Sequence, residues 1–218
     1  MAGSARAAET TTSSVDLEAR AQPRQQRAQA RREAILQATL DLLVGREVAD
    51  ISTSLVAAEA GVPVGSVYRY FPNKFAILTE LARRAMDLVD SRLEALMGGG
   101  PEEMGAAVDR GIDTILEIYR RDPAPRRLFR AVRTTPELAE VLRASNERMV
   151  QALLAALGRM RPDLPALRVE AAARTTVQIY THLEALAIEC EDPALYGLLV
   201  EEWKRAARSY LAAVLAAG

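Results

Sequence analysis

Apolar residues recur at helical spacing along almost the whole chain after residue 23, and no stretch alternates apolar and polar residues as a half-buried strand would. Only 5% of the 218 residues are aromatic, and the strong helix formers Ala, Leu, Arg and Glu are abundant. Half of the residues are hydrophobic and 26% are charged, which is ordinary for a globular protein. We therefore predict an all-α fold with about nine helices.

The chain contains one cysteine, Cys190, and one histidine, His182. An intramolecular disulfide needs two cysteines, and zinc sites are built mainly from Cys and His. No run of 18 apolar residues is present, and the first 30 residues lack the apolar core of a signal peptide. We expect a cytoplasmic protein with no metal site, no cofactor and no membrane contact.

Breaks in the periodicity divide the chain into segments. Residues 1–22 are small and polar and are predicted to form a disordered tail. The strongest break is Gly98-Gly99-Gly100-Pro101. The expected helices run from Pro23 to Gly45, Thr53 to Ala60, Pro63 to Phe71, Asn73 to beyond Val89, Glu102 to Arg121, Pro125 to Val132, Pro136 to Met160, Ala166 to Glu189, and Pro193 to Ala217.

The net charge of −1 is distributed unevenly. From Arg20 to Arg84 there are ten basic and six acidic residues, for a net charge of +4, whereas the residues from Ala85 onward carry −3. A basic N-terminal third on an acidic remainder is typical of a chain whose one end meets a polyanion.

Three predicted helices between Gln25 and Phe71 have the layout of a helix-turn-helix. The second and third are joined at Gly61, where the turn favours a residue that can adopt positive φ. Gly65 lies inside the short third helix, where glycine costs about 1 kcal/mol relative to alanine. Tyr68 and Tyr70 add hydroxyls that can reach phosphates or base edges. A plain helical hairpin within a bundle is the alternative interpretation.

The residues Ala60-Gly61-Val62, Gly65-Ser66-Val67-Tyr68, Tyr70-Phe71, Lys74 and Leu78 resemble the N-terminal signature of the tetracycline-repressor (TetR) family of bacterial transcriptional regulators. The resemblance covers about Arg31 to Leu81. It implies a homodimer in which residues 23–86 form the helix-turn-helix DNA-binding domain and residues 87–218 form a ligand-binding and dimerisation domain. A small-molecule effector would release such a protein from double-stranded operator DNA.

The resemblance also assigns roles to individual residues. Ser52 and Thr53 would contact phosphate at the start of the second helix, and Lys74 would bind a further phosphate. Pro63, Val64, Gly65 and Ser66 would begin the recognition helix, and Tyr68 and Tyr70 would face DNA. Five positions depart from the family pattern. Glu47 replaces a glycine, Leu55 and Phe75 replace polar residues, and Pro63 and Val64 replace a serine and a commonly basic residue.

Two arginine clusters remain to be interpreted. Arg20, Arg24, Arg27, Arg31 and Arg32 lie before or within the first helix, and this arm could follow the DNA backbone or be a solvated helix start. The second cluster is Arg120, Arg121, Arg126, Arg127, Arg130 and Arg133. We expect it to form salt bridges with acids such as Asp87, Asp90 and Glu94, and the alternative is an anionic ligand or a further DNA contact.

The resemblance places the effector pocket between the helices Glu102–Arg121, Pro136–Met160 and Ala166–Glu189. Large or adaptable side chains suited to its walls are Met104, Tyr119, Phe129, Met149 and Tyr180. Gln178, Thr181 and His182 could orient a ligand, although all eight residues could equally fill the core. Periodicity puts most charges of these segments on the solvent face, which favours an apolar or weakly polar effector. Cys190 is expected to be buried.

The last two helices, Ala166–Glu189 and Ala194–Leu215, are predicted to form the dimer interface. Their apolar stripes contain Leu195, Leu198, Leu199, Tyr210, Leu211 and Val214, and the small residues Ala171, Ala172 and Ala173 would allow close helix packing. A two-fold dimer presents two recognition helices to successive major grooves, so the operator should be palindromic.

Three classes of function compete for these features: a ligand-controlled repressor, an all-α enzyme and a helical adaptor. The sequence has no nucleophile–histidine pair, no glycine-rich phosphate loop and no metal-ligand spacing, so we predict no catalytic residues. The exposed chemistry of Tyr68, Tyr70 and Lys74 argues against an adaptor. The repressor is the hypothesis that the residues favour.

Overall fold

The computed structural model describes residues 22–121 and 123–216, and within them it contains α-helices and short 3₁₀ helices without any strand. The all-α prediction is confirmed. The predicted tail lies outside the described residues except for Gln22, which begins the first helix. The helices are α1 (Gln22–Gly45), α2 (Thr53–Glu59), α3 (Val64–Tyr70), α4 (Lys74–Leu96), α5 (Met104–Arg121), α6 (Pro123–Thr134), α7 (Ala139–Met160), α8 (Ala166–Glu189) and α9 (Pro193–Ala216), with the 3₁₀ helices η1 (Val48–Asp50), η2 (Pro101–Glu103) and η3 (Pro136–Leu138).

Side-chain caps mark the starts of α2 and α4. The Ser52 hydroxyl accepts a hydrogen bond from the Leu55 amide at 3.1 Å, and Asn73 accepts one from the Ala76 amide at 3.0 Å. Both caps satisfy backbone donors that a helix start leaves open. Gly61 joins α2 to α3 with a φ of 63°, as the turn requires.

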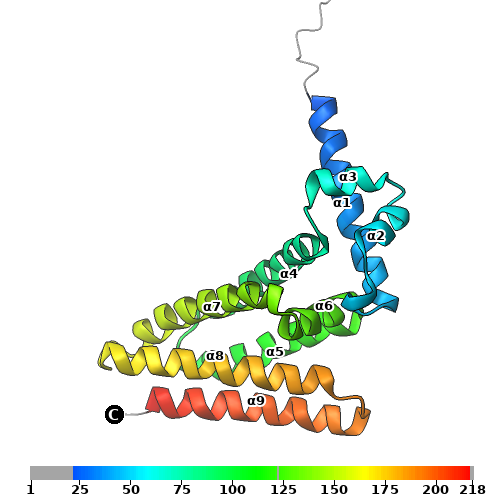
Figure 1. The fold of residues 1–218 in the computed structure, drawn as a ribbon. Coiled ribbons are helices and arrows are strands. Elements are labelled where there is room, and N and C mark those ends of the chain that lie inside the picture. The colour runs from blue at the N-terminus through cyan, green and yellow to red at the C-terminus, as the bar shows by residue number, and fades with distance from the viewer. Residues whose placement is uncertain (1–21, 122, 217–218) are drawn as a thin grey trace, which may run out of the picture.

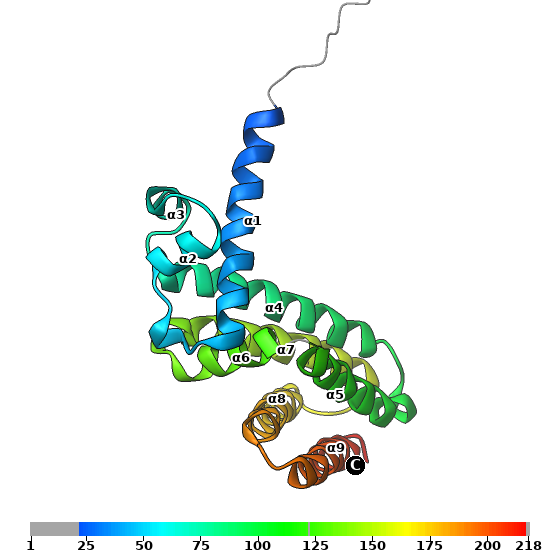
Figure 2. The same cartoon turned by 90° about the vertical axis from the view of Figure 1, so that its right-hand side faces the viewer.

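The head of the molecule consists of α1, α2, α3 and the first half of α4 (Figure 1). Its core is apolar, and the fully buried side chains include Ile35, Leu43, Val56, Val67 and Ile77. Leu55 and Phe75, which replace polar family residues, pack partly buried against this core. The N-terminal turns of α1 stand beyond the head in both views (Figures 1 and 2).

The body consists of the second half of α4 together with α5 to α9. Helix α8 packs between α7 and α9, and α8 and α9 run antiparallel at the end farthest from the head (Figure 1). Helix α4 leaves the head and continues along the body against α5 and α7 (Figure 2). It therefore spans the predicted boundary between residues 86 and 87, and both predicted domains share this helix.

None of the helices within residues 22–121 and 123–216 combines the length and the apolar composition needed to cross a membrane.

Candidate nucleic-acid interface and ligand cavity

Helix α3 presents most of its surface to solvent. Val67 is its one buried residue, whereas Val64 is 39% exposed and Tyr68 is 54% exposed. Gly65 has open space around it, because an added Cβ would meet no heavy atom within 4 Å, and its φ is not positive. The fold of the chain therefore places no demand for glycine at position 65, and the backbone there is free for close approach by another molecule.

The remaining predicted DNA contacts differ in exposure. The hydroxyls of Thr53 and Tyr68 lie 3.0 Å apart and join the start of α2 to α3. Pro63 is exposed and is the N-cap residue of α3, while Ser66 is half-buried. Tyr70 is also half-buried and its ring packs against the core of the head, so only part of this side chain can face DNA.

Lys74 has partners inside the protein. Its ammonium group donates to the backbone carbonyls of Val48 at 2.9 Å and Ala49 at 3.3 Å, and it lies 5.5 Å from the centre of the Phe75 ring. Sequence reasoning explained this cation in the first turn of α4 by a phosphate contact alone. The two carbonyls at η1 give a second reason for a lysine at this position. A phosphate contact by Lys74 stays a prediction.

The predicted basic arm divides into exposed and paired arginines. Arg27 and Arg31 are exposed on α1. Arg32 instead binds Glu80 of α4 at 2.8 Å, and its guanidinium lies 5.5 Å from the centre of the Phe71 ring. Arg20 and the side chain of Arg24 lie outside what the structure describes.

Arg84 completes a network with Arg32 that fastens α1 to α4. It binds Glu33 at 2.6 Å and Glu80 at 2.9 Å. The hydrogen bonds from Arg84 and Arg32 lower the pKa of Glu33 and of Glu80, respectively, below their ordinary values. Because α1 and α4 are joined in this way, the head is fixed to the helix that enters the body.

The second arginine cluster does not pair with the acids that we expected. Asp87 and Asp90 bind Arg148 of α7, at 2.9 and 2.7 Å. Arg126 donates to the carbonyls of Ile188 and Cys190, and Arg133 donates to the carbonyl of Thr181 at 3.1 Å. The expectation was wrong because α7 lies along α4 and brings Arg148 to Asp87 and Asp90, while Arg126 and Arg133 of α6 reach backbone carbonyls at α8.

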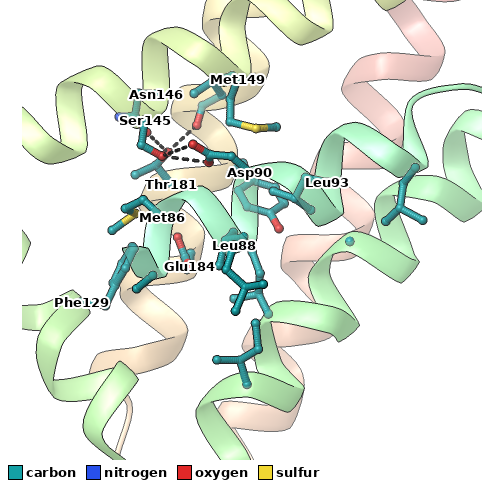
Figure 3. A pocket seen from close by; sticks show the side chains of 18 of the residues that line it. Met86, Leu88, Asp90, Leu93, Phe129, Ser145, Asn146, Met149, Thr181 and Glu184 are labelled. Carbon is teal, nitrogen blue, oxygen red and sulfur yellow. Dashed lines mark hydrogen bonds between the residues drawn. The ribbon is translucent and has the colours of Figure 1, made fainter. Parts of the chain in front are cut away.

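The body encloses a cavity of about 210 Å³ between α4, α5, α6, α7 and α8 (Figure 3). Since a water molecule takes up roughly 30 Å³ in the liquid, this space suits a small organic molecule. Six of the eight predicted ligand residues line it: Met104, Tyr119, Phe129, Met149, Tyr180 and Thr181. Gln178 and His182 do not, because both are exposed on α8, where the Nδ1 of His182 lies 2.9 Å from the Gln178 carbonyl. His182 is thus neither a core residue nor a cavity residue.

Sequence reasoning named Asp90 as a salt-bridge partner of the second arginine cluster and missed its place in the cavity wall. This carboxylate is buried in the cavity wall and accepts a hydrogen bond from Ser145 at 2.9 Å (Figure 3). It also binds Arg148 at 2.7 Å. Burial raises the pKa of Asp90, and the hydrogen bonds from Ser145 and Arg148 oppose that shift.

Sequence reasoning also missed Glu184, which is buried in the same wall. It accepts a hydrogen bond from the Tyr119 hydroxyl at 2.8 Å, and burial raises the pKa of Glu184 to about 7. The spacing of Val177, Thr181, Glu184 and Ile188 at four- and three-residue steps puts all four on one helix face. Because Glu184 shares this face with the apolar residues Val177 and Ile188, the periodicity of α8 was the sequence signal that this acid is buried.

The outer faces of α8 and α9 carry exposed leucines. Leu167 is 80% exposed and Leu198 is 59% exposed, with Leu186 and Leu195 also at the surface. The predicted stripe is only partly available, because Leu211, Val214, Ala172 and Ala173 are buried within the body itself. Cys190 is half-buried rather than buried.

No group of three or more His, Cys, Asp or Glu side chains in the described part of the chain could hold a metal ion. The structure combines three features. Helix α3 is exposed on the head, the body contains a mostly apolar cavity, and α4 runs from the core of the head into the wall of that cavity. They define a helix-turn-helix protein with a separate internal cavity.

Comparison with known families agrees with this architecture. Residues 35–81 match the model of bacterial regulatory proteins of the tetR family, and residues 104–211 match the tetracyclin repressor-like C-terminal domain. The chain belongs to the TetR family and is a DNA-binding transcriptional regulator.

Individual relatives share about a third or less of their residues with this chain over the matched regions. The transcriptional regulator EthR of Mycolicibacterium smegmatis is 29% identical over 73% of this chain and 76% of its own length. The transcriptional repressor KstR of Rhodococcus jostii is 34% identical over 43% of this chain and 42% of its own length. Among solved structures, a TetR-family regulator from Streptomyces coelicolor has a TM-score of 0.57 at 27% identity, covering 84% of this chain and 99% of that one.

Proposed function

We propose that this chain is a cytoplasmic repressor that binds a palindromic operator as a homodimer and leaves it when a small molecule occupies the cavity. The observation that carries this proposal is the course of α4. Ile77 and Leu81 at one end of this helix belong to the core of the head, while Asp90 and Leu93 farther along line the cavity. A ligand that alters the cavity wall therefore acts on the same helix that holds the head.

The proposed DNA contacts are Arg31, Ser52, Thr53, Pro63, Val64, Gly65, Ser66, Tyr68, Tyr70 and Lys74. The exposure of α3 supports direct contact with bases by Val64 and Tyr68, because a helix must present its side chains outward to read a major groove. Exposed Arg31 supports a backbone contact by the basic α1.

The proposed dimer uses the outer faces of α8 and α9. Leucines 167, 186, 195 and 198 on these helices are exposed, and a second copy would cover them. Because this surface lies at the end of the body away from the head, pairing through it leaves both recognition helices free (Figure 1).

We propose binding rather than catalysis as the role of the cavity. The relatives named above are regulators, and His182 lies outside the cavity with a backbone carbonyl as its partner. The buried acids Asp90 and Glu184 accept hydrogen bonds from serine, arginine and tyrosine side chains, and these bonds fit a structural role for both acids.

The test is a gel mobility shift with DNA from upstream of the protein's own gene and with shuffled DNA of equal length. At low salt both fragments should bind, and at physiological salt only the upstream fragment should remain bound. Val64→Glu places a negative charge on exposed α3 and should abolish this binding without changing the oligomeric state.

The matched variant Leu198→Glu places the same charge on the α9 face. It should yield monomers by light scattering and weaken operator binding, because two half-sites are then no longer bound together. A wild-type protein that scatters as a 23.7 kDa monomer at micromolar concentration, or that binds both fragments equally at physiological salt, would contradict the proposal.

A further inference from the structure

The charged residues in the cavity wall are all of one sign. Among the described residues that line the cavity, Asp90 and Glu184 are acidic and none is Lys, Arg or His. The other walls are largely aliphatic and aromatic. A ligand in this space therefore meets two carboxyl groups and no cation.

The two carboxyl groups differ in whether a positive charge lies beside them. Asp90 has Arg148 at 2.7 Å and two contacts from the Ser145 hydroxyl. Glu184 has no basic nitrogen within 4.0 Å among the described residues, and its hydrogen-bond donor is the neutral Tyr119 hydroxyl at 2.8 Å. Arg133 lies near Glu184, but it donates to the Thr181 carbonyl instead. Glu184 is thus a buried acid without an ion-pair partner.

A second polar group beside Glu184 also lacks a partner. The Tyr180 hydroxyl lies one turn earlier on α8, is buried and makes no hydrogen bond within the described structure. Its ring packs edge-on against Trp203, with the ring centres 4.9 Å apart, so the side chain is held in place. Buried polar groups are normally hydrogen-bonded, and an unpartnered one marks a place where a ligand or water is bound.

We propose that the cavity binds an amine with an apolar body, whose ammonium group binds the Glu184 carboxylate and the Tyr180 hydroxyl. The proposal rests on the proposed function, because it names the ligand class of the same cavity. An ammonium group supplies several hydrogen-bond donors and the missing positive charge, and opposite charges attract more strongly in a buried site than in water. An alcohol supplies no charge, and a carboxylate would be repelled by both acids.

Proton release should accompany binding. Burial raises the pKa of Glu184 to about 7, while the Tyr119 hydroxyl of α5 and Arg133 of α6 oppose that shift, so the empty cavity holds a mixture of acid and carboxylate at neutral pH. Of the other groups around the cavity, Tyr180 on α8 has its pKa raised well above its ordinary value, and Asp90 on α4 is held by Arg148. Ammonium binding requires the carboxylate, so its affinity should rise as the pH rises through 7.

The experiment uses isothermal titration calorimetry with n-octylamine, n-octanol and n-octanoate, which share one apolar body. At pH 8 octylamine should bind at least tenfold more tightly than octanol, and octanoate should bind most weakly. Between pH 8 and pH 6 the affinity for octylamine should fall about tenfold, since a group with a pKa of about 7 is mostly protonated at pH 6. Buffers of different ionisation enthalpy should reveal the released proton.

Two variants locate the effect. Glu184→Gln keeps the shape and should remove both the advantage of octylamine over octanol and its pH dependence. Tyr180→Phe should weaken octylamine about threefold or more while keeping the pH dependence, and circular dichroism melts show whether each variant is folded. If either variant is unfolded, the other one and the wild-type pH profile still decide the question.

Octylamine that fails to bind, that binds no better than octanol, or that keeps its advantage in folded Glu184→Gln overturns the amine proposal. Mobility shifts on the same samples report on the proposed function separately. If octanol releases operator DNA as well as octylamine does, the proposed function stands and the amine preference falls. If octylamine binds as expected but the protein shows no operator preference, the proposed function falls and the ligand class stands.

Discussion

The head and the cavity region are built from the same kinds of helix, but they differ in how they are filled. In the head, buried side chains such as Ile35, Val56 and Ile77 are apolar, and buried Thr39 satisfies its hydroxyl on the Ile35 carbonyl of its own helix. Around the cavity, acids and tyrosine hydroxyls are buried beside about 210 Å³ of space. A filled core holds one geometry, whereas an incompletely filled wall with unpartnered groups can change when a ligand enters.

The largest expected effect compares two isoleucines of equal burial. Ile77 is fully buried in the head and Ile115 is 1% exposed in the cavity wall. Ile77→Ala should lower the free energy of unfolding by about 4 kcal/mol, within the range known for such truncations. Ile115→Ala should cost about 2 kcal/mol, because part of its side chain already faces empty space. Urea denaturation at one pH measures both, and equal losses would remove the distinction between the two regions.

The next effect is the pH dependence that the cavity imposes on stability. Burial raises the pKa of Glu184 from an ordinary 4.5 to about 7, so the folded chain holds this proton more tightly than the unfolded chain does. The free energy of unfolding should therefore fall as the pH rises from about 4.5 through 7, by on the order of 3 kcal/mol.

Glu184→Gln removes the titrating group and should flatten this profile. Urea denaturation at pH 5, 6, 7 and 8 measures the free energy of unfolding of both proteins. Profiles of equal slope in the wild type and in Glu184→Gln would show that the buried acid does not control the stability of the body.

The smallest effect concerns the edge of the head. Lys74→Met keeps the aliphatic stem but removes the hydrogen bonds to the Val48 and Ala49 carbonyls, and it should cost about 1 kcal/mol in urea denaturation. If Lys74 also binds phosphate, the variant should bind operator DNA with a weaker salt dependence. The slope of log K against log salt concentration should fall in magnitude by about one unit.

Arg31→Met is the matched control, because it removes an exposed charge of α1. The Arg31→Met variant should keep nearly the wild-type free energy of unfolding. Only the salt dependence of its operator binding should become weaker. A Lys74→Met protein that is destabilised but keeps the wild-type salt dependence would restrict Lys74 to its role inside the head.

Much of this fold was predictable from local signals. The range of α8, the cap at Asn73 and the turn at Gly61 follow from periodicity, capping chemistry and conformational freedom, which act within a few residues. The helix-turn-helix was predictable for the same reason, since its motif is contiguous.

The partners of individual charges were not predictable, because they depend on which helices become neighbours. Arg148 was not singled out, yet the packing of α7 against α4 makes it the partner of Asp90. Arg126 and Arg133 reach carbonyls of α8, and backbone partners of this kind leave no trace in the sequence. Gln178 and His182 were misplaced because a polar residue on a mostly apolar helix can lie on either face.

In the function that we propose, the single helix α4 would act as a lever. Its 23 residues make it about 35 Å long at about 1.5 Å per residue, and the network of Arg32, Glu33, Glu80 and Arg84 clamps α1 to its head end. A tilt of about 5° around the cavity end would carry the head sideways by about 3 Å over that length. This distance is close to the rise of one base pair, about 3.4 Å, so a small adjustment around a ligand would move a recognition helix by about one step along the DNA.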